Sequence, residues 1–177
     1  MCFLVSALSM ALLGCVPTDM PTESPTPSPS ASPGPVSAQF GDIGTLQEIL
    51  QSGGFRVSAS SGLLEATAGT AVHVRVADEG SDGEFDSVTL EISPLTALDD
   101  DPVAGPTVDF VLALFDSWSP EAGARTREVL QGPRGTVQTR EETTEPVDGG
   151  FTLHLDLSYG HDSASEDYFR ATLARPD

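Results

Sequence analysis

Apolar and polar side chains alternate with a period of two in four short segments of the chain. Residues 72–76 (VHVRV) and 88–92 (VTLEI) flank one polar loop, and residues 153–157 (LHLDL) and 169–173 (FRATL) flank another. This period is typical of a strand with one buried face. The pattern therefore predicts two β-hairpins, and Val57 of an earlier strand should lie on the same buried face. The predicted buried positions of the hairpins are Val72, Val74, Val76, Val88, Leu90, Ile92, Leu153, Leu155, Leu157, Phe169 and Leu173.

Two helix ends with similar sequences precede these hairpins. Residues 48–51 (EILQ) run into a Ser-Gly-Gly stop, and residues 128–131 (EVLQ) run into Gly-Pro. Both are signals for the end of a helix, and we expect a strand after each, near residues 55–58 and 136–138. A further strand is expected near residues 63–67.

The start of the second helix is equally marked. Ser119-Pro120-Glu121 combines a capping residue, a proline at the first helical position and an acid in the first turn. The stretch before it, residues 107–118, is the most apolar of the domain. Its spacing fits a helix with Thr107 as the cap after Pro106, and a buried strand fits nearly as well, so the pattern leaves this element open.

The two hairpins are related by a constant offset. Residues 72–92 align with residues 153–173 without a gap, and His73 and Asp86 coincide with His154 and Asp167. We interpret the chain as a duplicated helix-strand-hairpin unit, with repeats at 42–93 and 119–174. The predicted fold class is α+β, an antiparallel sheet with helices packed on one face.

The N-terminal segment indicates where the domain is held. Residues 2–14 are uncharged and too short to span a bilayer, as in the apolar region of a secretory signal. Leu12-Leu13-Gly14-Cys15 resembles the lipobox of bacterial lipoproteins, although no basic residue precedes the apolar run. The resemblance implies a signal peptide over 1–14 and acyl chains such as palmitate on Cys15, which anchor the protein at the outer face of the cell membrane.

Residues 15–39 are expected to be a disordered tether. Seven of the 14 prolines lie there, with serine and threonine between them. An extended polyproline segment of this length reaches roughly 70 Å. The remaining residues, 40–177, are long enough for a single domain with its own core.

Composition narrows the functions that the domain can have. It carries 25 acidic residues against eight arginines, so we expect no nucleic-acid partner. Both cysteines precede residue 16, which excludes a disulfide or a thiolate metal site in the domain. The chain has no Lys or Asn, whose codons are A/T-rich, and this favours a high-GC Gram-positive bacterium as the source.

The two hairpin loops are the candidate ligand sites. Calcium takes six to eight oxygen ligands, and acidic loops supply them. The candidate ligands are Asp78, Asp82, Glu84, Asp86, Asp162 and Asp167. Solvated turns would explain the same composition without a bound metal. Calcium is the only cofactor that the sequence suggests, and we expect no other.

No catalytic motif is found among the remaining polar residues. The sequence lacks GxSxG and phosphate-binding glycine loops. His73 and His154 alternate away from the apolar face, and Arg125, Arg127, Arg134 and Arg140 are expected to pair with acids or to hold an anion. We therefore expect a non-enzymatic lipoprotein that binds an unidentified protein or small molecule outside the membrane. The alternatives are a calcium-binding module and an extracytoplasmic hydrolase that uses paired carboxylates.

Overall fold

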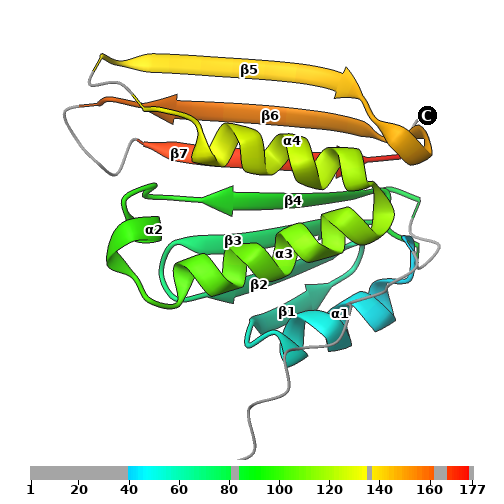
Figure 1. Cartoon of the computed structure of the whole chain (residues 1–177). Helices are drawn as coiled ribbons and strands as arrows, with labels where there is room; N and C mark the ends of the chain where they lie inside the picture. Colours follow the sequence, from blue (N-terminus) through cyan, green and yellow to red (C-terminus); the bar gives the residue numbers. More distant parts are fainter. Residues whose placement is uncertain (1–39, 81–83, 135–136, 162–166, 176–177) are drawn as a thin grey trace, which may run out of the picture. The chain divides into compact units, whose positions relative to one another are not determined.

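A computed structural model of the chain describes residues 40–80, 84–134, 137–161 and 167–175. All of them belong to one unit, residues 33–177. Seven antiparallel strands form a single sheet in the order β1-β2-β3-β4-β7-β6-β5 (Figure 1). The strands are β1 (Arg56–Ser60), β2 (Leu63–Ala68), β3 (Val72–Ala77), β4 (Ser87–Ile92), β5 (Thr139–Pro146), β6 (Thr152–Tyr159) and β7 (Tyr168–Ala174).

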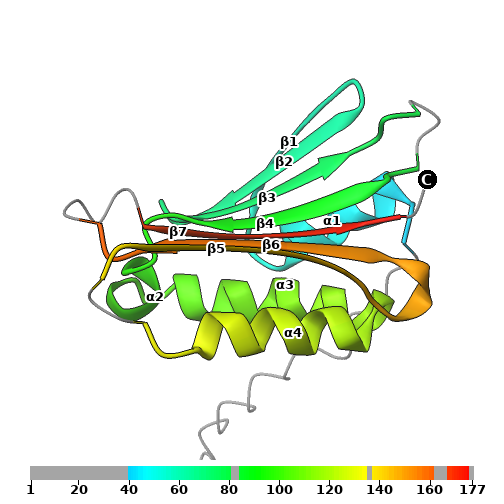
Figure 2. The ribbon, with the colours of Figure 1, turned by 90° about the horizontal axis from the view of Figure 1, so that it is seen from above.

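The helices cover one face of this sheet. They are α1 (Ile43–Ser52), α2 (Ala97–Asp100), α3 (Ala104–Trp118) and α4 (Pro120–Gln131), and a 3-10 turn, η1 (Asp148–Gly150), follows β5. Figures 1 and 2 show α3 and α4 side by side against the sheet, and none of the described helices lies on the opposite side. The predicted α+β fold is confirmed. In the part of the chain that the structure describes, no helix has the length and apolarity needed to cross a membrane.

The core lies between the helices and the sheet, where the alternating pattern placed it. Every predicted buried position in the two hairpins is at most 5% exposed, and Val57 packs at the margin of the same core. A second group of fully or partly buried side chains was not predicted. Phe40, Phe85, Trp118 and Phe151 form an aromatic cluster, with the rings of Phe40 and Phe85 4.5 Å apart between centroids.

The open element, residues 107–118, belongs to helix α3. Its helically spaced apolar residues are buried: Val108, Val111, Leu112, Phe115 and Trp118. The expected cap was wrong, because the helix begins three residues before Thr107, whose hydroxyl donates to the carbonyl of Val103 at 2.6 Å. A helix tolerates proline in its first turn, where the backbone N–H needs no helical partner, so Pro106 lies inside the helix. The second predicted start is confirmed, since Ser119 caps α4.

The two hairpins have matching register. Val72 pairs with Ile92, and Leu153 pairs with Leu173, so the cross-strand pairs repeat at the offset of 81 residues. At the centre of the sheet Leu90 pairs with Ala171, its own counterpart at that offset. The pairing pattern of β3-β4-β7-β6 is therefore that of two hairpins related by a local twofold axis.

The elements before the hairpins match less well than predicted. Strand β1 follows α1 and pairs with β2, whereas β5 follows α4 and pairs directly with β6, in the place that β2 has beside β3. Strand β5, which follows the second helix of the predicted repeat, begins at Thr139, just beyond the expected residues 136–138. Strand β5 contains no alternating apolar residues, which is why the sequence pattern did not locate it.

Candidate functional site

The face of the sheet opposite the helices, here called the open face, carries mostly polar side chains. Alternate residues of a strand point to opposite faces, so the positions between the buried residues lie on this side. The register aligns them in two rows across all seven strands. One row is Arg56, Thr67, His73, Glu91, Arg170, Asp156 and Glu142, and the other is Ser58, Glu65, Arg75, Thr89, Thr172, His154 and Thr144.

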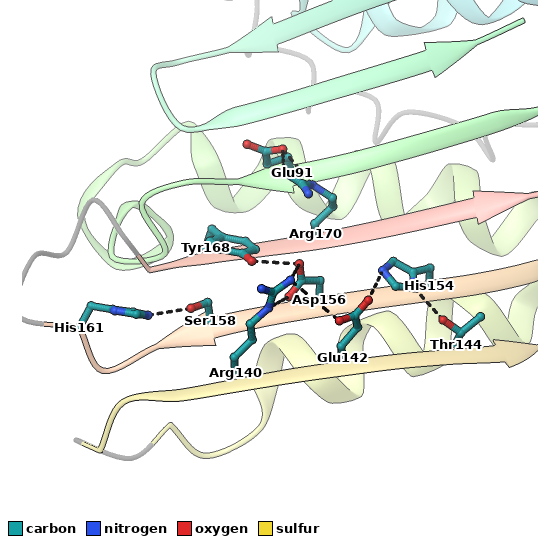
Figure 3. Close-up of polar contacts among 10 residues, drawn as sticks. All are labelled: Glu91, Arg140, Glu142, Thr144, His154, Asp156, Ser158, His161, Tyr168 and Arg170. Carbon is teal, nitrogen blue, oxygen red and sulfur yellow. Dashed lines mark hydrogen bonds and ion pairs between the residues drawn. The ribbon is translucent and has the colours of Figure 1, made fainter.

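Asp156 is the centre of a hydrogen-bonded network on β5, β6 and β7 (Figure 3). Its carboxylate accepts hydrogen bonds from Arg140 Nε at 3.2 Å, from Arg140 Nη2 at 3.1 Å and from the Tyr168 hydroxyl at 2.9 Å. The Asp156 side chain is only 5% exposed, although no helix covers it. A buried carboxylate is stable when it is paired and hydrogen-bonded, and Arg140 and Tyr168 meet both needs.

The network also shifts the proton affinity of its members. Burial raises the pKa of Tyr168, and the hydrogen bond to the Asp156 carboxylate acts in the same direction. The hydrogen bond from Arg140 to Asp156 raises the pKa of the guanidinium, so Arg140 stays charged. The Arg170 guanidinium lies 5.7 Å from the centre of the Tyr168 ring. These contacts hold Arg140 and Tyr168 against the sheet.

His154 is held by two neighbours on β5. Its Nδ1 lies 2.7 Å from Thr144 Oγ1, and its Nε2 lies 3.4 Å from Glu142 Oε1. Glu142 also lies 3.9 Å from Arg140 Nη2, which links His154 to the Asp156 network. The prediction that His154 points away from the apolar face is confirmed by its place in this network.

A third contact joins β6 to the start of the following loop. Ser158 Oγ lies 2.8 Å from His161 Nε2, and Gln138 Nε2 lies 3.0 Å from His161 Nδ1. Ser158 is buried, with 4% of its surface exposed. A hydroxyl this buried is not accessible to a substrate, so we assign the contact a structural role: it fixes His161 beside the sheet.

A groove occupies the other half of the open face. It has a volume of about 490 Å³, within the range of small-molecule sites. Its polar side chains come from β2, β3, β4 and β7: Glu65, Thr67, His73, Arg75, Thr89, Glu91 and Arg170. Figure 2 shows the β1–β2 hairpin bending away from α3 and α4. Strand β2 of this hairpin contributes Glu65 and Thr67 to the groove.

The charged side chains of the groove fall into two kinds. Arg170 is fixed by Glu91, whose Oε2 accepts from Arg170 Nε at 3.1 Å and from Nη2 at 2.8 Å. Within the described part of the chain, the side chains of Glu65, Arg75 and His73 make no hydrogen bond or ion pair. All three are exposed, so they remain available to a ligand.

The described calcium candidates fall into two separate groups, one at each hairpin loop. The β3–β4 loop and the β6–β7 loop lie at opposite ends of the sheet (Figure 1), because the two hairpins run in opposite directions about the central pair. Asp82 and Asp162 lie outside the described residues. Among the residues that are described, no group of three potential metal ligands is found.

The other four acids of these loops all make contacts in the described structure. The backbone N–H of Glu79 donates to Asp86 Oδ2 at 2.8 Å, and Arg175 Nη1 donates to Glu84 Oε2 at 2.9 Å. Asp167 Oδ1 accepts from the backbone N–H of His161 at 3.1 Å. Asp78 is 8% exposed, and its backbone N–H donates to the carbonyl of Gly62. These bonds shape the two turns, and calcium binding stays a prediction.

The four arginines that the sequence grouped are separated in the fold. Arg127 pairs with Asp116, Arg125 lies 3.0 Å from Glu145 Oε1, and Arg140 joins Asp156. Arg134 donates to the carbonyl of Leu130 at 2.7 Å. Of the two predicted roles, pairing with acids is the one that the structure supports for three of them.

Sequence reasoning missed both parts of the open face. Asp156 and Arg75 were visible only as the polar members of alternating strands, and nothing in that pattern separates a buried carboxylate from an exposed guanidinium. The usable signal was the charge of these positions, since an acid or an arginine between apolar neighbours requires water or a partner. Locating the partner requires the strand order, which local patterns do not contain.

Comparison with known proteins adds no assignment. No family model matches the chain, and searches of curated proteins and of solved structures find no match. The features of the chain that point to a function are the open face and the N-terminal segment.

Proposed function

We propose that the protein is a membrane-anchored extracytoplasmic lipoprotein whose domain binds a ligand through the groove of its open face. The observation that carries the binding proposal is the set of exposed, unpaired side chains in that groove, Glu65, His73 and Arg75. The anchoring proposal is based on the lipobox-like Leu12-Leu13-Gly14-Cys15. A non-enzymatic role is favoured because, among the described residues that line the groove, no hydroxyl is hydrogen-bonded to a histidine or a carboxylate.

The charge distribution supports a recognition role for the open face. Among the described strand residues on that face, four arginines stand against four acids: Arg56, Arg75, Arg140 and Arg170 against Glu65, Glu91, Glu142 and Asp156. The whole chain has a net charge of −19. Half of all the arginines are thus placed on one surface, which makes it locally neutral and lowers the repulsion that an incoming ligand meets.

The anchor is tested by changing the cysteine. We expect Cys15→Ser to prevent lipid attachment and to move the protein from the membrane fraction to the soluble fraction of cells, because the acyl chains on this cysteine supply the membrane affinity. The measurement is fractionation with immunoblotting and mass spectrometry of residue 15. Cys2→Ser is the matched control and should leave the distribution unchanged. A Cys15→Ser protein that stays in the membrane with its signal removed would contradict the proposal.

The binding face is tested by mapping where ligands act. Low-molecular-mass cell-envelope extract is added to the isotope-labelled full chain, and amide chemical shifts are compared with and without it. We expect changes along β2, β3 and β4 and on the adjoining part of β7. Changes confined to α3 and α4 or to the acidic loops, or no change at all, would contradict the assignment of the groove.

A further inference from the structure

We propose that the groove selects zwitterions, such as an amino acid or a short peptide, with a carboxylate at Arg75 and an ammonium group at Glu65. The proposal rests on the function proposed above and names the chemical class of its ligand. It starts from the two charged groove residues that have no partner in the described structure. They carry opposite charges and lie on neighbouring strands.

The register places these two side chains next to each other. Glu65 pairs with Arg75 across β2 and β3, and Thr89 lies opposite Arg75 on the other side, on β4. Directly opposed residues of antiparallel strands have their β-carbons about 5 Å apart. A ligand whose positive and negative groups are separated by a few bonds therefore reaches both side chains at once.

The chemistry of each side chain suits the proposed group. The planar guanidinium of Arg75 can donate two parallel hydrogen bonds to a carboxylate. The carboxylate of Glu65 can accept hydrogen bonds from an ammonium group. Thr89 supplies a further hydroxyl beside Arg75, and this hydroxyl lies 2.9 Å from that of Thr172 on β7. Thr67 and His73 line the groove next to Glu65 and Arg75.

A ligand can reach the charged groups of Glu65 and Arg75 without breaking a stable contact. Both side chains are exposed, and an exposed ion pair contributes little to stability, so a ligand can take the place of any transient contact between them. The neighbouring pair, Arg170 and Glu91, is already joined by two hydrogen bonds. That pair forms a fixed wall of the groove, and Glu65 and Arg75 remain as its free charged groups.

The charge of the whole molecule favours a zwitterion over a simple anion. A chain with a net charge of −19 repels anions at long range, whereas a zwitterion carries no net charge. A cation is attracted everywhere on such a surface, and it leaves Arg75 without a partner. The ligand that satisfies both groove charges without long-range repulsion carries one charge of each sign.

The test is a titration of the full chain with glycylglycine, followed by the imidazole proton resonances of His73 in NMR spectra. The chain contains three histidines, so these resonances can be assigned with one variant, His73→Gln. We expect saturable shifts of the His73 signals. The signals of His154 should not move, because His154 is held on β5 and β6, outside the groove.

Three variants locate the charges that matter. Arg75→Gln and Glu65→Gln should each weaken glycylglycine binding at least tenfold, because each removes one charged hydrogen-bonding partner. Arg56→Gln is the matched control: Arg56 lies on the same face without a side-chain partner in the described structure, and it does not line the groove. Its binding should stay within twofold. Thermal unfolding verifies that all three variants are folded.

Two matched probes separate this proposal from its competitors. N-acetylglycine keeps only the carboxylate and glycinamide only the amine, and we expect both to bind at least tenfold more weakly than glycylglycine. Equal binding of N-acetylglycine, with no effect of Glu65→Gln, would show an anion site and overturn the proposal. No binding of glycylglycine, while envelope extract still shifts the groove signals, would refute the zwitterion class and leave the groove as a binding site. If neither has an effect, both proposals fail.

Discussion

The two halves of the sheet carry the same hairpin but treat their polar side chains differently. His73 on β3 and His154 on β6 occupy matching positions, and each lies opposite a threonine, Thr67 or Thr144. His154 is bonded to Thr144 at 2.7 Å, whereas His73 makes no side-chain bond in the described structure. Equal backbone positions therefore do not imply equal roles.

The next matching pair shows the difference more sharply. Arg75 on β3 is exposed, and Asp156 on β6, its counterpart at the 81-residue offset, is buried beneath Arg140 and Tyr168. The cause is the outer strand of each half. Strand β5 contributes Arg140 and Glu142 next to β6, whereas β2 contributes Leu63 and Glu65 next to β3. In the half that contains β5 and β6, side chains bonded to Asp156 cover the sheet surface. In the half that contains β2 and β3, the sheet surface is open and forms the groove.

The largest expected effect comes from removing the buried carboxylate. Asp156→Ala should lower the free energy of unfolding by about 2 kcal/mol, because charged hydrogen bonds to Arg140 and Tyr168 are lost. The matching substitution in the other half, Arg75→Ala, should change it by less than about 0.5 kcal/mol. Urea unfolding of both variants measures the difference. Equal losses at the two positions would show that the halves are not distinct in stability.

An intermediate effect is expected where helix α4 begins. Ser119 Oγ accepts from the backbone N–H of Ala122 at 3.1 Å and also contacts Asp148, so it joins α4 to the turn after β5. Ser119→Ala should cost about 1 kcal/mol of stability, the usual contribution of a capping side chain. Ser119→Asp is the informative companion, since it restores a cap but places a second carboxylate beside Asp148.

Thermal and urea unfolding serve for this comparison too. Ser119→Asp should remain less stable than the original protein because its carboxylate and that of Asp148 repel each other, and high salt should reduce this deficit. If Ser119→Ala unfolds at the same urea concentration as the original protein, the cap contributes nothing to the fold.

The smallest effect concerns the pH dependence of the half that contains β5 and β6. Burial raises the pKa of Tyr168, and the hydrogen bond to Asp156 adds to it. The folded state therefore holds this proton more tightly than the unfolded chain, so the contribution is complete below the ordinary phenol pKa of about 10 and is lost as the pH rises through the raised value. Tyr168→Phe should make the decline of stability above about pH 10 less steep.

The measurement is a series of urea unfolding curves from neutral to alkaline pH. Tyr159→Phe is the control, because it removes the other tyrosine of the chain and leaves Asp156 with its partners. If Tyr168→Phe and the original protein lose stability with the same slope, another group causes the alkaline loss.

Several parts of the fold could be predicted from local patterns. The period-two segments located β3, β4, β6 and β7, and the Ser-Pro-Glu signal located the start of α4. The strand expected near residues 136–138 lies further along the chain, as β5, because its sequence, TREETTEP, presents no apolar face to count. Helix α3 stayed undecided because a short apolar run satisfies both periods, and its burial against the sheet is a tertiary fact.

The candidate site was less predictable than the fold. The acidic loops attracted attention through composition; they lie at opposite ends of the sheet, and calcium binding at either of them stays a prediction. The groove residues were hidden among ordinary polar positions. Composition finds clusters that are local in sequence, whereas this groove is assembled from four strands.

The sequence by itself determined which side of each alternating strand is buried, because only one face of such a strand is apolar and moving that face out of water is favourable. It also carries the lipobox-like segment and the charge of the domain. Only the tertiary structure decided which polar groups meet. Arg140 and Asp156 are 16 residues apart and Arg170 and Glu91 are 79 apart, so their pairing depends on strand order and register, which many long-range contacts determine together.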